Sequence, residues 1–328
     1  MLLINGTNTN PYFNLAMEEY FLKTTDEDIF LLWRNDNAII VGKNQNTLSE
    51  INYDYVKKNN IKVVRRQSGG GAVFHDLGNI NFTFISCDNN SFSDFKRFTM
   101  PIIDALKELG VEAEFSGRND LLIKNQKFSG NAQYNYKDKV MHHGTLMFSS
   151  HINDLSMALK VKPSKFEGKG VKSVKSRVTN ISSHLDMDMD VLEFKDYLMN
   201  FINKRDENSH FYELTNNDIE NINKLVEEKY STWEWNFGHS PKYALNNELR
   251  YAGGSVEFSL DVKNGLIEKI KFFGDFFGKK DVSFVEEKLI NIKHHEESIK
   301  AALENIDINS YFLNCNVDIL AGGIMGAK

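Results

Sequence analysis

The sequence predicts an α/β protein with two domains. Its 328 residues are enough for two domains, or for one large domain with an appendage. Strand-like and helical patterns alternate through most of the chain, and near Ser240-Pro241 they give way to a hairpin followed by helices, which is enough for a small second domain. We therefore expect residues 1–242 to form the first domain and residues 247–328 the second, with a linker over 240–247.

Apolar spacing and turn residues define the elements of the first domain. Apolar residues three and four positions apart indicate helices, and short apolar or β-branched runs indicate strands. The expected strands cover residues 2–4, 29–33, 38–41, 61–65, 80–86, 111–115 and 121–123, and another precedes Gly144. The expected helices cover residues 14–23, 53–58, 95–109, 154–160, 191–203 and 217–229.

The second domain is expected to begin with a hairpin. Residues 256–262 and 267–273 alternate between apolar and polar side chains, and Lys263-Asn264-Gly265 between them is a strong turn sequence. Amphipathic helical patterns follow at 284–290 and 295–303, and a short helix is expected in the tail.

Composition and charge exclude several classes of protein. A net charge of −6 argues against a general nucleic-acid binder. The only two cysteines, Cys87 and Cys315, form no CxxC pair, which argues against a disulfide framework and a Cys-rich zinc site. The N-terminus lacks the pattern of a signal peptide, and no apolar run approaches membrane-spanning length. We expect a cytoplasmic protein without membrane partners.

The most informative stretch begins at Val63 and reads VVRRQSGGGAVFHDLGNINF. A glycine triplet at 69–71 costs backbone entropy, so it is used for an unusual turn or for close approach to a ligand. Arginines beside it favour an anionic ligand, because glycine N–H groups and guanidinium groups both donate to oxyanions. The alternative is a tight hairpin with solvated arginines.

Two common nucleotide motifs do not fit this loop. The G-x-G-x-x-G pattern would need a third glycine at position 74, where the chain has Phe74. The nearest approach to Walker A, Gly274 to Gly278-Lys279-Lys280, is one residue too short and lacks the Ser or Thr. A Rossmann dinucleotide domain and a P-loop NTPase are therefore disfavoured.

Two further segments carry candidate chemistry. Asp120, at the start of a strand, could hold a magnesium ion or a ligand amine, and Lys127 beside small residues could reach a phosphate; ordinary surface charges on a turn are the alternative. The adjacent His142 and His143 must face opposite sides of a strand, so only one can point into a site. No metal-binding spacing accompanies them, and we interpret His143 as a hydrogen-bonding residue beside the site.

Nucleophilic catalysis has weak support in the sequence. Cys87 follows the end of an expected strand and is a formal candidate for a nucleophile, but a small buried cysteine is the preferred interpretation. No G-x-S-x-G elbow is present.

Together these segments resemble lipoate–protein ligase A, within the larger fold group that also contains biotin–protein ligases and octanoyl transferases. Eight matching strings occur in the family's order and span nearly the whole chain. They are NLAMEE from Asn14, LWRN from Leu32, RRQSGGGAVFHDLGN from Arg65, GRNDLLIK from Gly117, KFSG from Lys127, HHGTLMF from His142, SVKSRVTN from Ser173 and WEWNFG from Trp233.

The resemblance implies a mixed-sheet α/β catalytic domain followed by a small α/β accessory domain. It also implies a two-step reaction, in which lipoate and ATP give lipoyl-adenylate and pyrophosphate, and a lysine of a lipoyl domain then takes the lipoyl group and releases AMP. The implied partners are lipoyl domains of 2-oxoacid dehydrogenase acyltransferase subunits and the glycine-cleavage H protein.

The resemblance also assigns roles to residues. Lys127 and Asp120 would be catalytic, with Asp120 helping to place Mg²⁺. The implied ATP-binding residues are Arg66, Gly71, Ala72, Val73, Phe74 and Lys127. The implied lipoate-binding residues are Trp33, Arg66, Ser68, Gly69, Gly70, His75, Lys127, Gly130 and His143, with Trp33 at the deep end of the lipoyl tunnel. The basic loop 168–180, which contains Lys172, Lys175 and Arg177, would close over the adenylate and shield it from water.

Two alternatives remain open from the sequence. One is an ATP-independent octanoyl or lipoyl transferase of the same fold, with Cys87 as its nucleophile. The other is a non-catalytic sensor that binds a lipoyl group or a nucleotide. The glycine loop, the basic loop and the accessory domain favour the ligase.

Overall fold

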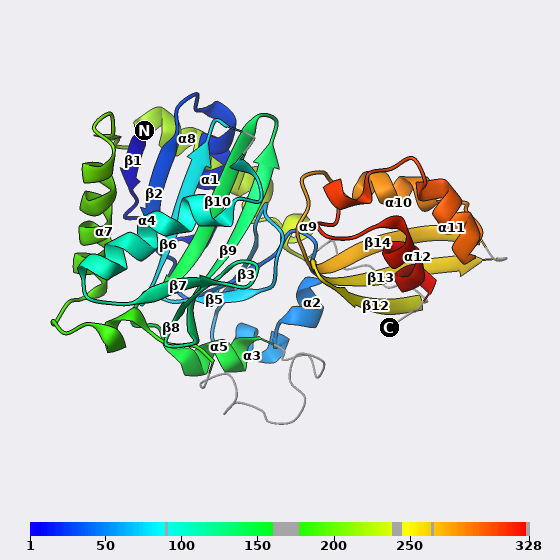
Figure 1. Ribbon diagram of the computed structural model, residues 1–328, viewed down its shortest axis with the longest axis horizontal. Helices are drawn as coiled ribbons and strands as arrows, with labels where there is room; N and C mark the ends of the chain where they lie inside the picture. Colours follow the sequence, from blue (N-terminus) through cyan, green and yellow to red (C-terminus); the bar gives the residue numbers. More distant parts are fainter. Residues whose placement is uncertain (89–90, 160–176, 238–244, 264–265, 326–328) are drawn as a thin grey trace.

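The computed structural model describes residues 1–88, 91–159, 177–237, 245–263 and 266–325. Within these ranges the chain forms two α/β units, a larger N-terminal one and a smaller C-terminal one, which lie beside each other (Figure 1). The predicted α/β class is confirmed. Among the described helices, none is both long and apolar enough to cross a lipid bilayer.

The larger domain contains most of the secondary structure. Its strands are β1 (Leu2–Asn5), β2 (Ile29–Trp33), β3 (Ala38–Val41), β4 (Lys62–Arg65), β5 (Val73–His75), β6 (Asn79–Ser86), β7 (Ala113–Ser116), β8 (Asp120–Ile123), β9 (Gln126–Tyr136), β10 (Lys139–Met147) and β11 (His210–Phe211). Its α-helices are α1 (Pro11–Thr24), α2 (Thr47–Glu50), α3 (Tyr53–Lys58), α4 (Phe95–Glu108), α5 (Ile152–Ala158), α7 (Val191–Arg205), α8 (Asn216–Leu225) and α9 (Trp233–Asn236).

An eight-stranded mixed sheet with the order β11-β1-β2-β6-β10-β9-β8-β7 forms the centre of this domain. Strand β2 reads IFLLW without a polar residue because both of its faces are covered. Phe30 and Leu32 pack toward α4 and α7, whereas Leu31 and Trp33 pack toward α1 on the other face (Figure 1). The domain therefore has a separate apolar core on each side of its sheet.

A second, three-stranded sheet positions the glycine loop. Its order is β4-β3-β5, with β3 parallel to β4 and antiparallel to β5. Strands β2 and β3 follow each other in sequence but belong to different sheets, so the turn at 35–37 carries the chain from one sheet to the other. The glycine loop is the connection from the end of β4 to the start of β5.

The C-terminal domain is an antiparallel sheet covered by helices. Strands β12 (Leu245–Tyr251), β13 (Gly254–Lys263) and β14 (Leu266–Phe276) pair in that order. Helices α10 (Ser283–Leu289), α11 (Glu296–Leu303) and α12 (Val317–Met325) close one core with this sheet. The expected pairing of β13 with β14 is confirmed, while the central turn residues 264 and 265 lie outside the described residues.

Four strands were not predicted, and the reasons differ. Strand β11 has only two residues, both of them exposed. Strand β5 has only three residues, and β12 falls partly in the expected linker because its sequence, LNNELRY, is polar. Strand β9 was missed because its sequence, QKFSGNAQYNY, lacks apolar alternation. It is nevertheless well covered, since Ser129, Asn131 and Gln133 are all buried and hydrogen-bonded.

Candidate active site

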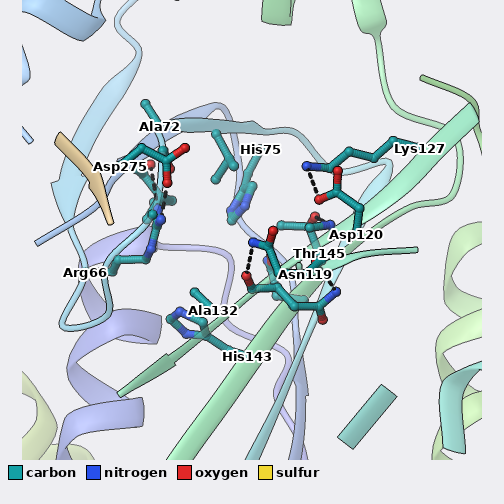
Figure 2. A pocket seen from close by; sticks show the side chains of 18 of the residues that line it. Arg66, Ala72, His75, Asn119, Asp120, Lys127, Ala132, His143, Thr145 and Asp275 are labelled. Atoms are coloured by element: carbon teal, nitrogen blue, oxygen red, sulfur yellow. Dashed lines mark hydrogen bonds and ion pairs between the residues drawn. The ribbon is translucent and has the colours of Figure 1, made fainter. Parts of the chain in front are cut away.

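A cavity of about 330 Å³ lies between the glycine loop, strands β8 to β10 and the C-terminal domain (Figure 2). Most of the residues predicted for the site line it. They are Trp33, Arg66, Gly70, Gly71, Ala72, Val73, His75, Asp120, Lys127, Gly130 and His143. The cavity therefore collects side chains from segments more than one hundred residues apart in the sequence.

Lys127 and Asp120 form an ion pair at one end of the cavity. Their Nζ and Oδ1 atoms lie 2.7 Å apart, and both side chains are partly exposed (Figure 2). Gly130 leaves the room that Lys127 occupies, since a β-carbon at position 130 would lie 3.0 Å from Nζ. A cation paired with a carboxylate and facing a cavity can bind an anionic ligand once the pair opens.

The backbone of Lys127 also anchors the end of the predicted basic loop. Its N–H donates to the carbonyl of Arg177 at 2.8 Å, and its carbonyl accepts from the N–H of Thr179 at 2.9 Å. Arg177, whose side chain is exposed, therefore enters the domain directly beside Lys127. Lys172 and Lys175, the other two predicted residues of this loop, lie outside the described residues.

The two arginines that precede the glycine loop have different surroundings. Arg65 is fully buried, and its guanidinium donates to the carbonyls of Gly42, Gln45 and Trp235 at 2.7–2.9 Å. Burial and the neighbouring Arg66 lower the pKa of Arg65 to about 10. The expectation that both arginines serve an anion is wrong for Arg65, which holds the loops around β3 and β4 together.

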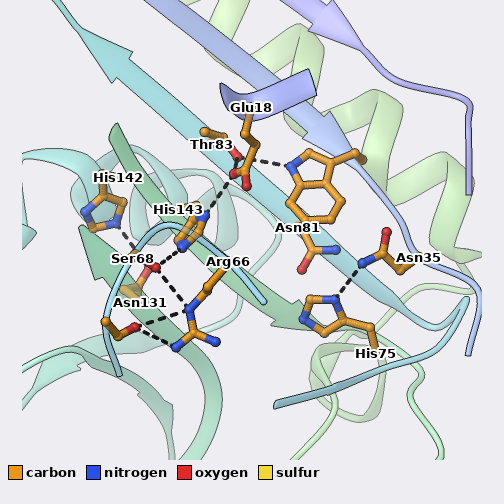
Figure 3. Close-up of polar contacts among 12 residues, drawn as sticks. Glu18, Asn35, Arg66, Ser68, His75, Asn81, Thr83, Asn131, His142 and His143 are labelled. Atoms are coloured by element: carbon orange, nitrogen blue, oxygen red, sulfur yellow. Dashed lines mark hydrogen bonds and ion pairs between the residues drawn. The ribbon is translucent and has the colours of Figure 1, made fainter. Parts of the chain in front are cut away.

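Arg66 lines the cavity and shapes the glycine loop. Its guanidinium donates to Ser68 Oγ at 3.0 Å and to the carbonyls of Gly69 and Gly71 at 2.7 and 2.9 Å (Figures 2 and 3). Burial lowers its pKa to about 10, so it still carries a charge at neutral pH. The loop's carbonyls therefore turn toward Arg66.

The glycine triplet meets the C-terminal domain. Gly70 has φ of +92°, which a residue with a side chain rarely adopts. A β-carbon on Gly69 would lie 2.2 Å from the carbonyl oxygen of Phe276 at the end of β14. Gly69 therefore serves a close approach to protein backbone, and it is absent from the residues that line the cavity.

An arginine and an aspartate from the two domains complete the rim of the cavity. Arg118 lies 4.6 Å from the ring centre of Phe277, donates to the Gly253 carbonyl and pairs with Asp275 at 3.4 Å. Asp275 also lines the cavity (Figure 2). Sequence reasoning noted Arg118 only as part of the GRND string and missed Asp275, because nothing local indicates that the second domain reaches the site.

A buried chain of polar groups supports the cavity wall. Glu18 Oε1 accepts from Thr83 Oγ1 at 2.6 Å and lies 2.8 Å from His143 Nδ1 (Figure 3). His143 Nε2 lies 2.6 Å from Ser68 Oγ. Because the Glu18 carboxylate accepts from Nδ1–H, Nε2 of His143 is the acceptor of the hydrogen bond that the Ser68 hydroxyl donates. This chain fixes His143 and Ser68 together.

The predicted division between the two adjacent histidines is confirmed. His143 faces the cavity, whereas His142 is stacked on Phe82 and Phe98 and contacts Gln133. Burial and the neighbouring His143 hold the pKa of His142 well below its usual value. Two other predicted residues, Ser68 and Phe74, are buried behind the wall, with Phe74 in the core of the three-stranded sheet.

A cysteine nucleophile, as the transferase alternative would use, finds no support in the geometry. Cys87 is exposed at the end of β6, so its interpretation as a small buried cysteine is wrong. It does not line the cavity, and partial burial and the nearby Asp28 raise its pKa. The described part of the chain contains no group of three or more His, Cys, Asp or Glu side chains that could hold a metal ion.

Family models match both parts of the chain. Residues 10–203 match the lipoyl protein ligase A/B catalytic domain, and residues 240–322 match the bacterial lipoate protein ligase C-terminus. The lipoate-protein ligase LplJ of Bacillus subtilis is 49% identical over 320 residues, covering 96% of this chain and 97% of that protein. Lipoate–protein ligase 1 of Staphylococcus aureus is 48% identical over 311 residues, covering 94% of each.

Solved structures give the same result. LipL1 of P. falciparum in complex with lipoate superposes with a TM-score of 0.79 at 28% identity, covering 99% of this chain and 98% of that one. The bipartite lipoate protein ligase of Thermoplasma acidophilum, described with its E2 lipoyl domain, gives a TM-score of 0.64 at 31% identity. The match covers 74% of this chain and 98% of that one. A lipoate-protein ligase A bound with ATP gives a TM-score of 0.62 at 29% identity, covering 73% of this chain and 98% of that one. The chain belongs to the lipoate–protein ligase family.

Proposed function

We propose that this chain joins lipoate to a lysine of a lipoyl domain in two steps at the one cavity. In the first step a lipoate carboxylate oxygen bonds to the α-phosphorus of ATP, the bond to the bridging oxygen breaks, and pyrophosphate leaves. In the second step the lysine amine attacks the carbonyl carbon, the bond to AMP breaks, and the amine proton is released. The Lys127–Asp120 pair facing the cavity is the observation that carries this proposal.

Lys127 is the catalytic cation of the first step. Lipoate and ATP are both anions, so their approach needs a fixed positive charge where negative charge accumulates. The Lys127 ammonium would leave Asp120 and bridge the lipoyl carbonyl and the α-phosphate. Asp120 holds the ammonium in position until the substrates arrive, because the two groups already lie at hydrogen-bond distance.

The nucleotide binds along the glycine loop. Gly71, Ala72 and Val73 line the cavity beside Arg66, so the loop backbone and the guanidinium would face the phosphates. Phe74, whose side chain packs in the core of the three-stranded sheet, would contribute through its backbone. Mg²⁺ takes phosphate oxygens together with one or two carboxylates. The site fits that pattern, since Asp120 offers one hard oxygen ligand, and the ion would neutralise charge on the triphosphate.

Lipoate occupies the remainder of the cavity. The apolar side chains of Leu15, Ile40 and Trp33 line it, as an alkyl chain requires. Gly70 would shape this part from the loop, with Ser68 and Gly69 behind it, and His75, Gly130 and His143 would border the acid.

The basic loop, residues 168–180, would close over the adenylate. The backbone carbonyl of Arg177 accepts a hydrogen bond from the N–H of Lys127, and Lys172 and Lys175 precede Arg177 in the sequence. Closure would shield the mixed anhydride from water, and the three cations would hold its phosphate. Residues 247–328 would act as an accessory domain next to the catalytic residues 1–242.

The partners are lipoyl domains of 2-oxoacid dehydrogenase acyltransferase subunits or the glycine-cleavage H protein. The relative from Thermoplasma acidophilum, described with its E2 lipoyl domain, supports this class of partner. The reaction would occur in the cytoplasm, where the two unpaired cysteines remain reduced. We propose no nucleic-acid or membrane partner.

The test is lipoate-dependent ATP–pyrophosphate exchange in a Lys127→Ala variant. We expect a loss of roughly 10²-fold or more, as for removal of one transition-state donor. Lys107→Ala, on the exposed side of α4, is the matched control and should exchange normally. Near-normal exchange in Lys127→Ala would overturn the assignment. Intact mass of lipoyl domains incubated with lipoate, ATP and Mg²⁺ then identifies the acceptor.

A further inference from the structure

The inner end of the cavity is apolar on its sides but carries two polar groups. Trp33 and Asn81 are directly paired between β2 and β6, and the rings of Trp33 and His75 lie 6.2 Å apart. All three residues line the cavity and are at most 3% exposed. Trp33 donates its indole N–H to Thr83 at 3.0 Å, so it presents apolar surface there.

Hydrogen bonds to the backbone determine which nitrogen of His75 carries the proton. Asn14 Nδ2 donates to the carbonyls of Asn8 and Arg34 at 2.9 Å, which identifies it as the donor end of that amide. It also lies 3.0 Å from the Asn35 amide, and a donor nitrogen needs an acceptor opposite it, so Oδ1 of Asn35 faces Asn14 and Asn35 Nδ2 is the atom 3.1 Å from His75 Nδ1 (Figure 3). Nδ1 of His75 is therefore an acceptor, and Nε2 carries the hydrogen.

The Nε2–H group of His75 has no hydrogen-bond partner among the described residues. Burial, helped by the charge of Arg66, lowers the pKa of His75 to about 3, so the ring stays neutral and the tautomer stays fixed at physiological pH. Asn81 also has a buried donor without a partner in the part of the chain that the structure describes. Its Oδ1 accepts from Asn79 at 3.0 Å, while its Nδ2 has no partner among the described residues.

Two buried N–H donors without acceptors are costly in a folded protein, so a ligand atom that accepts from them is strongly favoured. If the acid's carboxylate lies at Lys127, as the proposed function requires, the far end of the substrate reaches Trp33. In lipoate that end is a dithiolane ring, whose sulfur atoms are weak acceptors. In octanoate it is a methyl group, which accepts nothing.

We propose that His75 Nε2–H and Asn81 Nδ2–H donate hydrogen bonds to the dithiolane sulfur atoms and thereby select lipoate over a plain fatty acid. The alkyl walls at Leu15 and Ile40 would hold either acid equally well. The two donors are thus specificity-determining residues, and Lys127 remains the catalytic one.

The first experiment uses the unaltered protein. Its kcat/KM in ATP–pyrophosphate exchange is compared for lipoate, octanoate and 5-cyclopentylpentanoate, which replaces the dithiolane by an all-carbon ring of similar shape. We expect lipoate to exceed the cyclopentyl acid by about 2- to 10-fold for each donor, the range that a net hydrogen bond supplies. Equal use of the two ring-bearing acids would overturn the proposal, whereas no exchange with any acid would overturn the proposed function instead.

The second experiment uses Asn81→Leu and His75→Leu. Each should lower the ratio of lipoate to cyclopentyl-acid kcat/KM by about 2- to 10-fold. Ile40→Val is the control, since it removes one methyl group from a wall that all the acids share and should leave the ratio unchanged. A ratio that stays the same in both leucine variants would contradict the proposal, and a variant that fails to fold leaves the decision to the first experiment.

Discussion

A β-carbon on Gly130 would lie 3.0 Å from the Nζ atom of Lys127 and 3.1 Å from its Cε. The contact falls on the far end of a flexible side chain, so the fold can accept it. Gly130→Ala should therefore displace the Lys127 ammonium without unfolding the protein. We expect kcat/KM for lipoate-dependent exchange to fall roughly 10-fold or more, because a small misplacement of a reacting group has a large effect on rate.

Thermal unfolding of the same variant is the control for Gly130→Ala. Its midpoint should stay within a few degrees of the unaltered protein, since no backbone atom is approached. A stable Gly130→Ala protein with full exchange activity would show that the position of Lys127 does not limit the first step.

The second prediction concerns Arg65. Arg65→Met should lower the free energy of unfolding by about 3 kcal/mol or more, because several buried carbonyls lose their donor. Arg65→Lys should be nearly as harmful, since an ammonium cannot reproduce the planar fork of donors. Urea unfolding monitored by circular dichroism measures both variants.

Arg97→Lys provides the matched comparison for Arg65→Lys. Arg97 is exposed on α4 and pairs with Asp88, so its replacement should change stability by less than about 1 kcal/mol. If Arg65→Lys proved equally mild, the buried network around it would not be a major source of stability.

Much of the fold followed from repetitive local patterns. Helix α4 was predicted within one residue, because its apolar stripe against polar neighbours is independent of the rest of the chain. The longest strand that was not predicted, β9, is one whose burial comes from polar contacts. Ser129 and Asn131 of β9 are buried but hydrogen-bonded, so apolar alternation could not reveal them.

A site residue was predictable where the residues that position it lie close to it in the sequence. Lys127 with Gly130 is such a case, since the small residue that makes room lies three positions away. Glu18 escaped because its partners, Thr83 and His143, come from distant strands. Asn81 escaped because the residues that line the cavity beside it, Trp33 and His75, belong to other segments of the chain. One usable signal was present, namely that polar residues 79, 81 and 83 alternate with apolar ones on a strand in the middle of the sheet.

The third prediction concerns the contact between the two domains. Gly69→Ala would place a methyl group 2.2 Å from the Phe276 carbonyl oxygen, which no side-chain rotation can relieve. We expect the C-terminal domain to move away from the glycine loop, and the free energy of unfolding to fall by about 1–3 kcal/mol as this contact is lost. Small-angle scattering should show a larger radius of gyration, and an unchanged scattering profile with unchanged stability would contradict this.

The final prediction is a pH dependence of stability that originates at His75. Its pKa is about 3 in the folded protein, against about 6.5 for a free histidine. Between these pH values the unfolded chain binds a proton at His75 that the folded chain does not bind. The free energy of unfolding therefore rises with pH through this window, and the contribution of His75 reaches its full value above about pH 6.5. As the pH falls from 6.5 to 5, His75 alone should remove about 2 kcal/mol.

Urea unfolding at pH 7.5 and pH 5 measures this loss, and His75→Gln isolates the contribution of His75. The lowered pKa of His142 acts in the same direction and stays in both proteins, whereas the carboxyl of Glu19, with its pKa at about 2, acts below this window. The difference in stability between the two pH values should therefore be about 2 kcal/mol smaller in His75→Gln. An equal difference in the two proteins would mean that His75 takes up its proton without unfolding, which the buried bond from Asn35 to Nδ1 argues against, because a protonated ring could no longer accept it.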